Sequence, residues 1–384
     1  MSERVTVART VDDVEALRPA WQRLPVGDID ADIDYFLTVI RHRSEVVRPH
    51  VVLIERDGVP RLIIAARLEE APLDIRLGYR VLARPRLRTL RVAFGGVVGA
   101  AGDADRRRAL DELQRPLREG EADAVVLAQI EADGPLCALA RGCGSRMRRP
   151  HLDAPTAHWS VAIPGSMEEF LAQRSSRTRK NIRYYDRRLV RENPDLRVRT
   201  FRSESELDEL CADMEQIAAT TYQRTLGAGF TGDDQDRALM ALGMARGWFR
   251  AWVLYLGDRP VAFWHGYAYG GTFTTGCPGF DPAFARDRVG AYLAVRMIEQ
   301  LCTEDALHTL DWGAGDAEYK RTLGDAGRQE VDMMILAPTV AGLRAGFLRL
   351  SVAALGRVGK RTLGDRGVRR ARRMWRDRLA PEAP

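Results

Sequence analysis

The chain has 384 residues, of which 45% are hydrophobic and 29% charged, and a net charge of +6, which is ordinary for a globular protein of two or three domains. Five scattered cysteines include no Cys-x-x-Cys pair, which argues against a disulfide framework and against a zinc site. No signal-peptide pattern opens the chain and no window approaches 18 uninterrupted apolar residues, so we expect a cytoplasmic protein without a transmembrane helix.

The first half of the chain predicts a β-hairpin followed by a strand, a helix and a strand. Residues 51–68 read VVLIERDGVPRLIIAARL, two β-rich runs joined by a tight turn that contains Asp, Gly and Pro. The elements expected after this hairpin are a strand over 89–99, a helix from about 103 to 119 and a strand over 122–130. This order is typical of a mixed α/β domain.

The second half of the chain repeats that order. Residues 251–269, AWVLYLGDRPVAFWHGYAY, form a second predicted hairpin. The elements expected after it are a strand over 271–279, a helix from about 289 to 303 and a strand over 306–312. Hairpins can recur by chance in mixed α/β folds, but the shared order favours two related domains. We predict an N-terminal, non-catalytic domain (1–155), a C-terminal catalytic domain (156–338) and a basic amphipathic tail (339–384).

A basic helix is expected near the start of the second domain. Residues 175–191 contain seven Lys/Arg and one Asp, interleaved with two tyrosines. A run of charge is usually a solvated face, but this density also suits a sugar phosphate, the 3′-phosphate of coenzyme A or a tRNA backbone. The candidate substrate-binding residues are Arg179, Lys180, Arg183 and, further along the chain, Tyr222.

His265 lies within the second hairpin. A strand period of two places it on one face with Phe263, Tyr267 and Tyr269. Because imidazole exchanges protons near neutral pH, His265 is a candidate general base. The alternative is a histidine with a purely structural role, which is the more common case in a strand.

Residues 289–301 predict an amphipathic helix, with apolar side chains recurring every four residues. Gly290 lies in its first turn, where a missing side chain lets a ligand approach the backbone. Unpaired N–H groups and the helix dipole favour a pyrophosphate there. The predicted cofactor-binding residues are Arg288, Val289, Gly290 and Ala291. A glycine used only for packing is the alternative.

Residues 311–325 read DWGAGDAEYKRTLGD and follow an apolar run, at the carboxyl end of a predicted strand, where sites collect in α/β proteins. Asp316 suits an N-cap position, which would place Tyr319 and Lys320 in the first turn of a helix. A solvated helix with an Asp316–Lys320 ion pair is the alternative. The combination of glycines, tyrosine and lysine favours a catalytic site that includes Asp316, Tyr319 and Lys320. Two further carboxylates, Asp311 and Glu318, are alternative bases to His265.

The C-terminal tail carries the basic charge of the protein. Residues 340–379 contain 12 Lys/Arg and 2 Asp/Glu, a net charge of +10, which leaves −4 for the rest of the chain. An apolar helical stripe, formed by Leu343, Phe347, Leu350 and Ala354, precedes an arginine-rich segment. The tail therefore suits peripheral contact with an anionic membrane on the cytoplasmic side, docking onto the rest of the protein, or disorder.

Three of these stretches resemble the core of the GNAT acyltransferases, in the tandem-domain branch that includes BioF2-like (CelD/BcsL-type) and FemABX-type proteins. They are the basic helix 175–189, the strand, loop and helix 276–301, and 311–325, which is similar to the D-x-G-x-G-D-x-x-Y-K-x-x-x-G signature of that branch. The resemblance covers about residues 50–336 and implies two tandem domains of mixed sheets flanked by helices. One departure is that Arg288-Val289-Gly290-Ala291 retains a single glycine of the usual Gln/Arg-x-x-Gly-x-Gly/Ala loop.

The resemblance implies an N-acyltransferase that uses acyl-CoA, such as acetyl-CoA, and no metal. The acyl-CoA would lie along the helix that starts at Gly290, and an acceptor amine would attack the thioester directly. Lys320 would then stabilise the oxyanion and Tyr319 would protonate the leaving group. The implied acceptor is an amino sugar, a polysaccharide or lipid precursor, or a small amine.

Two other functions fit parts of the same pattern. An aminoacyl-tRNA-dependent transferase of the FemABX type would use the basic helix to bind tRNA, and its activity would depend steeply on salt. A non-catalytic scaffold at a membrane surface would explain the tail and the absence of reactive residues in the first domain, but it does not require the cluster of glycines, Asp, Tyr and Lys at 311–320.

Overall fold

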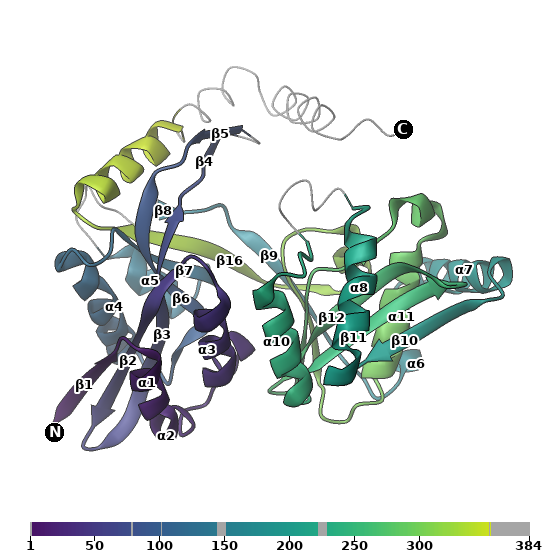
Figure 1. Ribbon diagram of the computed structural model, residues 1–384, viewed down its shortest axis with the longest axis horizontal. Coiled ribbons are helices and arrows are strands. Elements are labelled where there is room, and N and C mark those ends of the chain that lie inside the picture. The colour runs from purple at the N-terminus through teal and green to yellow at the C-terminus, as the bar shows by residue number, and fades with distance from the viewer. Residues whose placement is uncertain are drawn as a thin grey trace. The chain divides into compact units, whose positions relative to one another are not determined.

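The computed structural model describes residues 2–77, 80–100, 102–143, 151–221, 229–352 and 354. The chain forms two compact units (Figure 1). The first unit contains residues 1–26, 43–154 and 331–384, and the second contains 27–42 and 155–330. Neither unit is a single continuous stretch, because the chain enters the second unit early and returns to the first unit at its end.

The first unit is built on a twisted sheet. Its strands lie in the order β1 (Glu3–Ala8), β2 (Val46–Arg56), β3 (Val59–Pro72), β6 (Arg86–Val98), β7 (Ala124–Glu131) and the C-terminal half of β16 (Asp325–Leu336). Adjacent strands from β1 to β6 are antiparallel, and β6 pairs with β7 in parallel. The predicted hairpin is β2–β3, whose turn residues Asp57 and Gly58 both have positive φ, as a type I′ turn requires.

Helices complete the first unit. They are α1 (Val11–Ala16), α2 (Arg18–Trp21), α4 (Asp103–Arg118) and α5 (Pro135–Arg141), and the short strands are β4 (Ile75–Leu77), β5 (Arg80–Ala83) and β8 (His151–Leu152). One face of α4 and α5 packs on the sheet and buries Leu110, Leu113 and Cys137. Val331, Met333 and Ile335 of β16 belong to the same core, so a strand late in the sequence contributes to the interior of the first unit.

The second unit contains the repeated pattern. Its strands lie in the order β16, β9 (Thr156–Ala162), β15 (Thr309–Ala314), β13 (Thr272–Thr275), β12 (Arg259–Tyr269), β11 (Phe249–Leu256) and β10 (Leu196–Phe201), with β14 (Gly279–Phe280) pairing with β12. The predicted hairpin is β11–β12. β13 and β15 run in parallel over only three residue pairs, and β13 ends at Thr275. The predicted strand 271–279 is therefore interrupted before Gly279.

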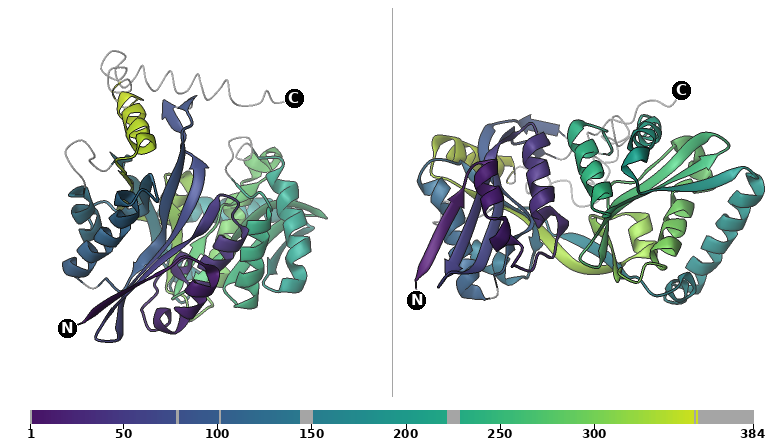
Figure 2. Two further views of the ribbon diagram at one scale, coloured as in Figure 1. Left: turned by 60° about the vertical axis from the view of Figure 1, so that its left-hand side comes forward. Right: turned by 60° about the horizontal axis from the view of Figure 1, so that its bottom comes forward.

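Helices cover both faces of this sheet (Figure 2). One layer contains α6 (Met167–Ala172), α7 (Ser176–Glu192) and α11 (Val289–Leu301), and the other contains α3 (Ile33–His42), α8 (Leu207–Ala218) and α10 (Asp234–Ala245). Short turns of helix complete the unit: η1 (Ile29–Ala31), η3 (Glu204–Glu206), η4 (Pro282–Asp287) and α12 (Glu318–Leu323). Leu293, Met297 and Leu301 of α11 are fully buried, as the four-residue spacing predicts.

The predicted fold class, mixed sheets flanked by helices in tandem domains, is confirmed. The predicted apolar stripe lies on a helix that covers residues 340–352, whereas the arginine-rich segment of the tail lies outside the described residues. In the part of the chain that the structure describes, no helix is long and apolar enough to cross a membrane.

Candidate functional site

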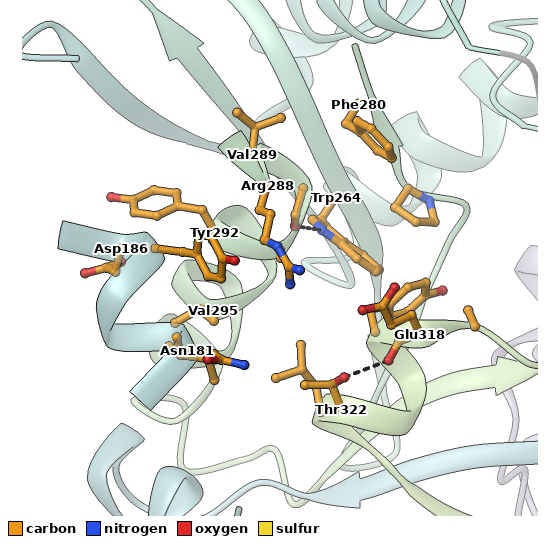
Figure 3. Close-up of a pocket in the computed structure, with 18 of the residues that line it drawn as sticks. Asn181, Asp186, Trp264, Phe280, Arg288, Val289, Tyr292, Val295, Glu318 and Thr322 are labelled. Atoms are coloured by element: carbon orange, nitrogen blue, oxygen red, sulfur yellow. Dashed lines mark hydrogen bonds between the residues drawn. The ribbon is translucent and has the colours of Figure 1, made fainter. Parts of the chain in front are cut away.

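A cavity of about 900 Å³ lies within the second unit, at the N-terminus of α11 (Figure 3). Three elements form its walls: α7, the turn from η4 into α11, and α12. The indole of Trp264, on β12, lies between them. Labelled lining residues come from each wall: Asn181 and Asp186 from α7, Val289, Tyr292 and Val295 from α11, and Glu318 and Thr322 from α12.

The N-terminus of α11 forms one wall of the cavity. Arg288 is its N-cap residue and has a left-handed backbone (φ 56°, ψ 36°), which is uncommon for a residue other than glycine. Its guanidinium carbon lies 4.4 Å from the ring centre of Tyr185 on α7. Among the described residues, no acceptor takes the backbone N–H groups of Val289 and Gly290. Two unpaired amides, the positive helix end and a guanidinium therefore lie at one cavity wall.

Gly290 is held close to the sheet. Its carbonyl oxygen accepts a hydrogen bond of 3.0 Å from Trp264 Nε1 (Figure 3). A Cβ atom at this position would lie 3.5 Å from the Phe280 ring, which is an ordinary contact. Packing alone therefore does not require glycine here, whereas a long side chain would enter the cavity. All four residues predicted to bind the cofactor, Arg288, Val289, Gly290 and Ala291, line the cavity.

Tyr319 lies on the opposite wall, on α12. Its ring packs edge-on against two indoles, with centre-to-centre distances of 5.2 Å to Trp264 and 5.6 Å to Trp312. Burial raises the pKa of the Tyr319 hydroxyl to about 12. The hydroxyl is therefore protonated at neutral pH and can donate a proton or a hydrogen bond to a group in the cavity.

Lys320 is turned away from the cavity. Its ammonium donates hydrogen bonds to the carbonyl oxygens of Gly313 (3.1 Å) and Ala314 (2.7 Å), and its side chain is buried. Burial also lowers the pKa of Lys320. Gly313 and Gly315 both have positive φ, so the loop between β15 and α12 follows a path that favours glycine. Lys320 thus holds this loop in place.

Replacing Lys320 with methionine is expected to lower the free energy of unfolding by about 1–3 kcal/mol, because two carbonyl groups lose their charged donor. Arg321, on the same helix, is the matched control. It forms an exposed ion pair with Asp316, so Arg321→Met is expected to cost less than about 1 kcal/mol. Urea unfolding of both variants measures the difference, and equal losses would contradict a bracing role for Lys320.

Asp316 does not cap α12, which corrects the predicted N-cap position. The N-cap residue is Ala317, and the Asp316 carboxylate instead accepts hydrogen bonds of 2.7 and 2.8 Å from Arg321. The helix begins one residue later than expected. Within α12, Tyr319 lines the cavity and the adjacent Lys320 is directed toward the loop.

His265 lies apart from the cavity. Its ring is buried beside Phe230, Phe249 and Phe263, with ring centres 6.0–6.5 Å apart. Burial lowers the pKa of His265 to about 4, so the ring is neutral. Gly276 packs so closely that a Cβ atom there would lie 2.2 Å from the imidazole. These contacts favour the structural alternative for His265.

The predicted substrate-binding residues do not line the cavity where the structure describes them. Arg179 donates to the carbonyl oxygens of Ala172 (3.3 Å) and Arg174 (2.7 Å), and Lys180 and Arg183 are exposed; none of the three lines the cavity. Other residues of α7 do line it: Arg177, Thr178, Asn181, Ile182, Tyr185 and Asp186. Tyr222 lies outside the described residues.

A histidine that the sequence did not single out joins the signature loop to two other strands. His158, on β9, is buried, and its Nε2 lies 2.7 Å from Asp311 Oδ1 on β15. Its Nδ1 lies 3.0 Å from Glu330 Oε2 on β16, an ion pair without good hydrogen-bond alignment. Asp311 also accepts the Gly313 N–H at 2.6 Å. The loop is therefore held from one side by Asp311 and from the other by Lys320.

Two carboxylates determine the charge of this histidine. Burial opposes protonation, but the short contact with Asp311 and the negative charges of Asp311 and Glu330 outweigh it and raise the pKa of His158 to about 9. At neutral pH the ring is an imidazolium between two acidic groups and cannot serve as a base. Within the described residues, no group of three or more His, Cys, Asp or Glu side chains is arranged to hold a metal ion.

A family model described as an acetyltransferase (GNAT) domain matches residues 176–321, which contain all the residues that line the cavity except Thr322 and Leu323. No curated protein matches the sequence. Among solved structures, FemX has a TM-score of 0.55 at 12% identity, and the alignment covers 88% of this chain and 97% of FemX. The structural match to FemX covers 88% of the chain even though the first unit is made of three separate segments.

Two more structures share the fold. A tandem GNAT protein from the clavulanic acid biosynthesis pathway has a TM-score of 0.50 at 11% identity, covering 88% of this chain and 99% of that one. The C-terminal domain of a protein from Agrobacterium fabrum, assigned as a lysylphosphatidylglycerol synthetase, has a TM-score of 0.50 at 13% identity, covering 89% and 96%. Residues 176–321 are therefore similar to GNAT acetyltransferase domains, and the chain shares its tandem fold with FemX and with the tandem GNAT protein.

Proposed function

We propose that the chain transfers an acyl group from acyl-CoA to an amine by direct attack of the amine on the thioester. The observation that carries this proposal is a cavity with a helix N-terminus and its unpaired amides on one wall and a protonated tyrosine on another. The pyrophosphate of coenzyme A would bind the amides of Val289 and Gly290, with Arg288 beside it. The thioester would then extend toward Tyr319.

The reaction needs one proton donor and one proton acceptor in this cavity. When the amine nitrogen bonds to the thioester carbonyl carbon, the oxygen becomes an oxyanion, and collapse of this intermediate breaks the carbon–sulfur bond. Tyr319 would supply a proton to the departing thiolate, and Glu318, the carboxylate on the same wall, would accept the proton lost by the amine. Lys320 would act indirectly in this scheme, by holding the loop before α12.

The acceptor class follows from family analogy: an amino sugar, a polysaccharide or lipid precursor, or a small amine.

One observation favours a second kind of acyl donor. Lys180 and Arg183 are exposed on α7, next to the cavity wall. These cations would suit an aminoacyl-tRNA, and the resulting activity would fall steeply with rising salt. Activity with an acyl-CoA would depend on salt much less.

Isothermal titration with acetyl-CoA and longer acyl-CoAs tests the proposed donor. We expect micromolar binding by the natural protein, a loss of at least about tenfold in Gly290→Glu, and little change in Gly290→Ala. The glutamate would place a negative charge and a long side chain where the pyrophosphate binds, whereas an alanine Cβ would make an ordinary contact with Phe280. Absence of binding to every CoA ester, or equal binding by Gly290→Glu, would overturn the proposal, and aminoacyl-tRNA would be titrated next.

A further inference from the structure

The helix over residues 340–352 presents large apolar side chains to solvent. It belongs to the first unit and is the yellow-green helix in Figure 1. Val340, Leu343, Phe347 and Leu350 are 85%, 50%, 71% and 55% exposed. Their spacing of three, four and three residues places all four on one side of the helix. A continuous exposed apolar stripe of this kind is unusual on a monomeric protein and marks an interaction surface.

The side of this helix that packs on the first unit is formed by small residues, which leaves the large apolar side chains on the outward side. Ala345 is fully buried against strands of the first unit. A Cβ atom on Gly342 would lie 2.6 Å from the carbonyl oxygen of Ala337 and 3.0 Å from that of Asp123, so the helix lies closely on its support. Arg349 is anchored to Asp153 at 2.6 Å. Small residues thus pack inward and large apolar residues point outward, which is the reverse of an ordinary amphipathic surface helix.

Positive charge near the apolar stripe favours one of three possible partners: a second copy of the chain, a nucleic acid or an anionic lipid bilayer. Arg344 is exposed on the same side of the helix, and the sequence from 353 to 384 contains ten Lys/Arg and three Asp/Glu. A second copy of the chain would bring an equally basic segment alongside and be repelled. A nucleic acid would bind the arginines but leave the apolar stripe exposed to water. An anionic bilayer surface satisfies both features, since it takes apolar side chains at its interface and cations at its headgroups.

We propose that the outward face of helix 340–352 docks the protein on an anionic lipid bilayer. Phe347 and Leu350 enter the interfacial region, and Arg344 on the same side of the helix contacts a lipid phosphate. The contact is peripheral in the described part of the chain, where no helix can span a bilayer. This inference does not depend on the identity of the acyl donor, because it rests on residues of the first unit.

Vesicle flotation of the full chain tests the proposal. We expect binding to phosphatidylcholine vesicles that contain phosphatidylglycerol and no binding to vesicles of phosphatidylcholine alone, with weakening as salt rises. Replacing both Phe347 and Leu350 with serine is expected to weaken binding by about tenfold or more. Replacing Arg369, Arg370, Arg372 and Arg373 with glutamine is expected to do the same.

The control is Val47→Ser, which changes another exposed apolar residue of the first unit and is expected to leave binding unaltered. Circular dichroism checks that each variant is folded, and the exposure of Phe347 and Leu350 favours folding of the double variant. The proposal is overturned if anionic vesicles do not bind, or if the Phe347/Leu350 double variant binds as well as the natural protein. It is also overturned if that double variant converts a dimer into a monomer without losing vesicle binding, since the stripe would then be an interface between copies.

Discussion

Replacing Tyr319 with phenylalanine is expected to lower kcat by about 10²- to 10⁴-fold, the usual contribution of a general acid. The dissociation constant for acyl-CoA should stay within about twofold, because the ring still packs between Trp264 and Trp312 and only the hydroxyl is lost. Since burial raises the pKa of this hydroxyl to about 12, a proton is available for the thiolate across the neutral range. Release of the CoA thiol, followed with a thiol reagent at saturating acyl-CoA, measures the change.

Thr322→Val is the matched control for this variant. Thr322 lies on the same helix and lines the same cavity, but its hydroxyl donates to the carbonyl oxygen of Glu318. We expect this control to retain kcat within about threefold, because it removes a hydroxyl with no proposed role in proton transfer. If Tyr319→Phe kept a rate similar to that of Thr322→Val, Tyr319 would not be the proton donor.

The second large effect is expected at His158, where loss of the imidazolium leaves the buried Glu330 and the partly buried Asp311 without their shared counter-charge. His158→Ala should therefore lower the free energy of unfolding by about 3–5 kcal/mol, the usual cost of breaking a buried ion pair from one side. Activity is expected to fall as well, because Asp311 holds the Gly313 amide in the loop that leads to Tyr319.

The contribution of His158 also depends on pH. The pKa is raised from 6.5 in the unfolded chain to about 9 in the folded protein, so the stabilisation is complete below pH 6.5 and is lost as pH rises through 9. The raised pKa corresponds to about 3 kcal/mol of stability. Urea unfolding between pH 6 and pH 10 should show this decline in the natural protein and not in His158→Gln. His308→Gln, a change at an exposed histidine, should keep the decline, and a flat profile in the natural protein would contradict the assignment.

The regular elements near the site could be predicted from local sequence. The β2–β3 and β11–β12 hairpins follow from turn residues that accept positive φ between β-rich runs. Helix α11 follows from the four-residue spacing of its buried side chains, and its N-terminus from the change of pattern at Arg288. These features depend on neighbours in the sequence, which explains why they could be predicted without an alignment.

The direction of individual side chains could not be predicted in the same way. Tyr319 and Lys320 are adjacent on α12, so their side chains point about 100° apart around the helix, and only Tyr319 lines the cavity. A strand period of two separates Trp264 from His265 correctly, but it does not indicate which side of the sheet carries the cavity. Whether a side chain lines the cavity depends on which helices cover each face of the sheet, and this packing is not visible in the local sequence.

The His158 cluster illustrates a different limit. Its partners Asp311 and Glu330 are more than 150 residues away, on strands that become neighbours only in the folded sheet. No spacing rule links a lone strand histidine to carboxylates at such separations. The same holds for residues 27–42, which lie early in the chain yet belong to the second unit.

The return of β16 to the first unit has a consequence for synthesis on the ribosome. Val331, Met333 and Ile335 complete a core whose other members lie before residue 141, so the interior of the first unit cannot close until nearly the whole chain has been translated. At about 5–20 residues per second, the interval is on the order of ten seconds or more, during which the growing chain displays apolar surface. Chaperone dependence during expression, and failure of fragments truncated after the first half, are the expected signs of this delayed closure.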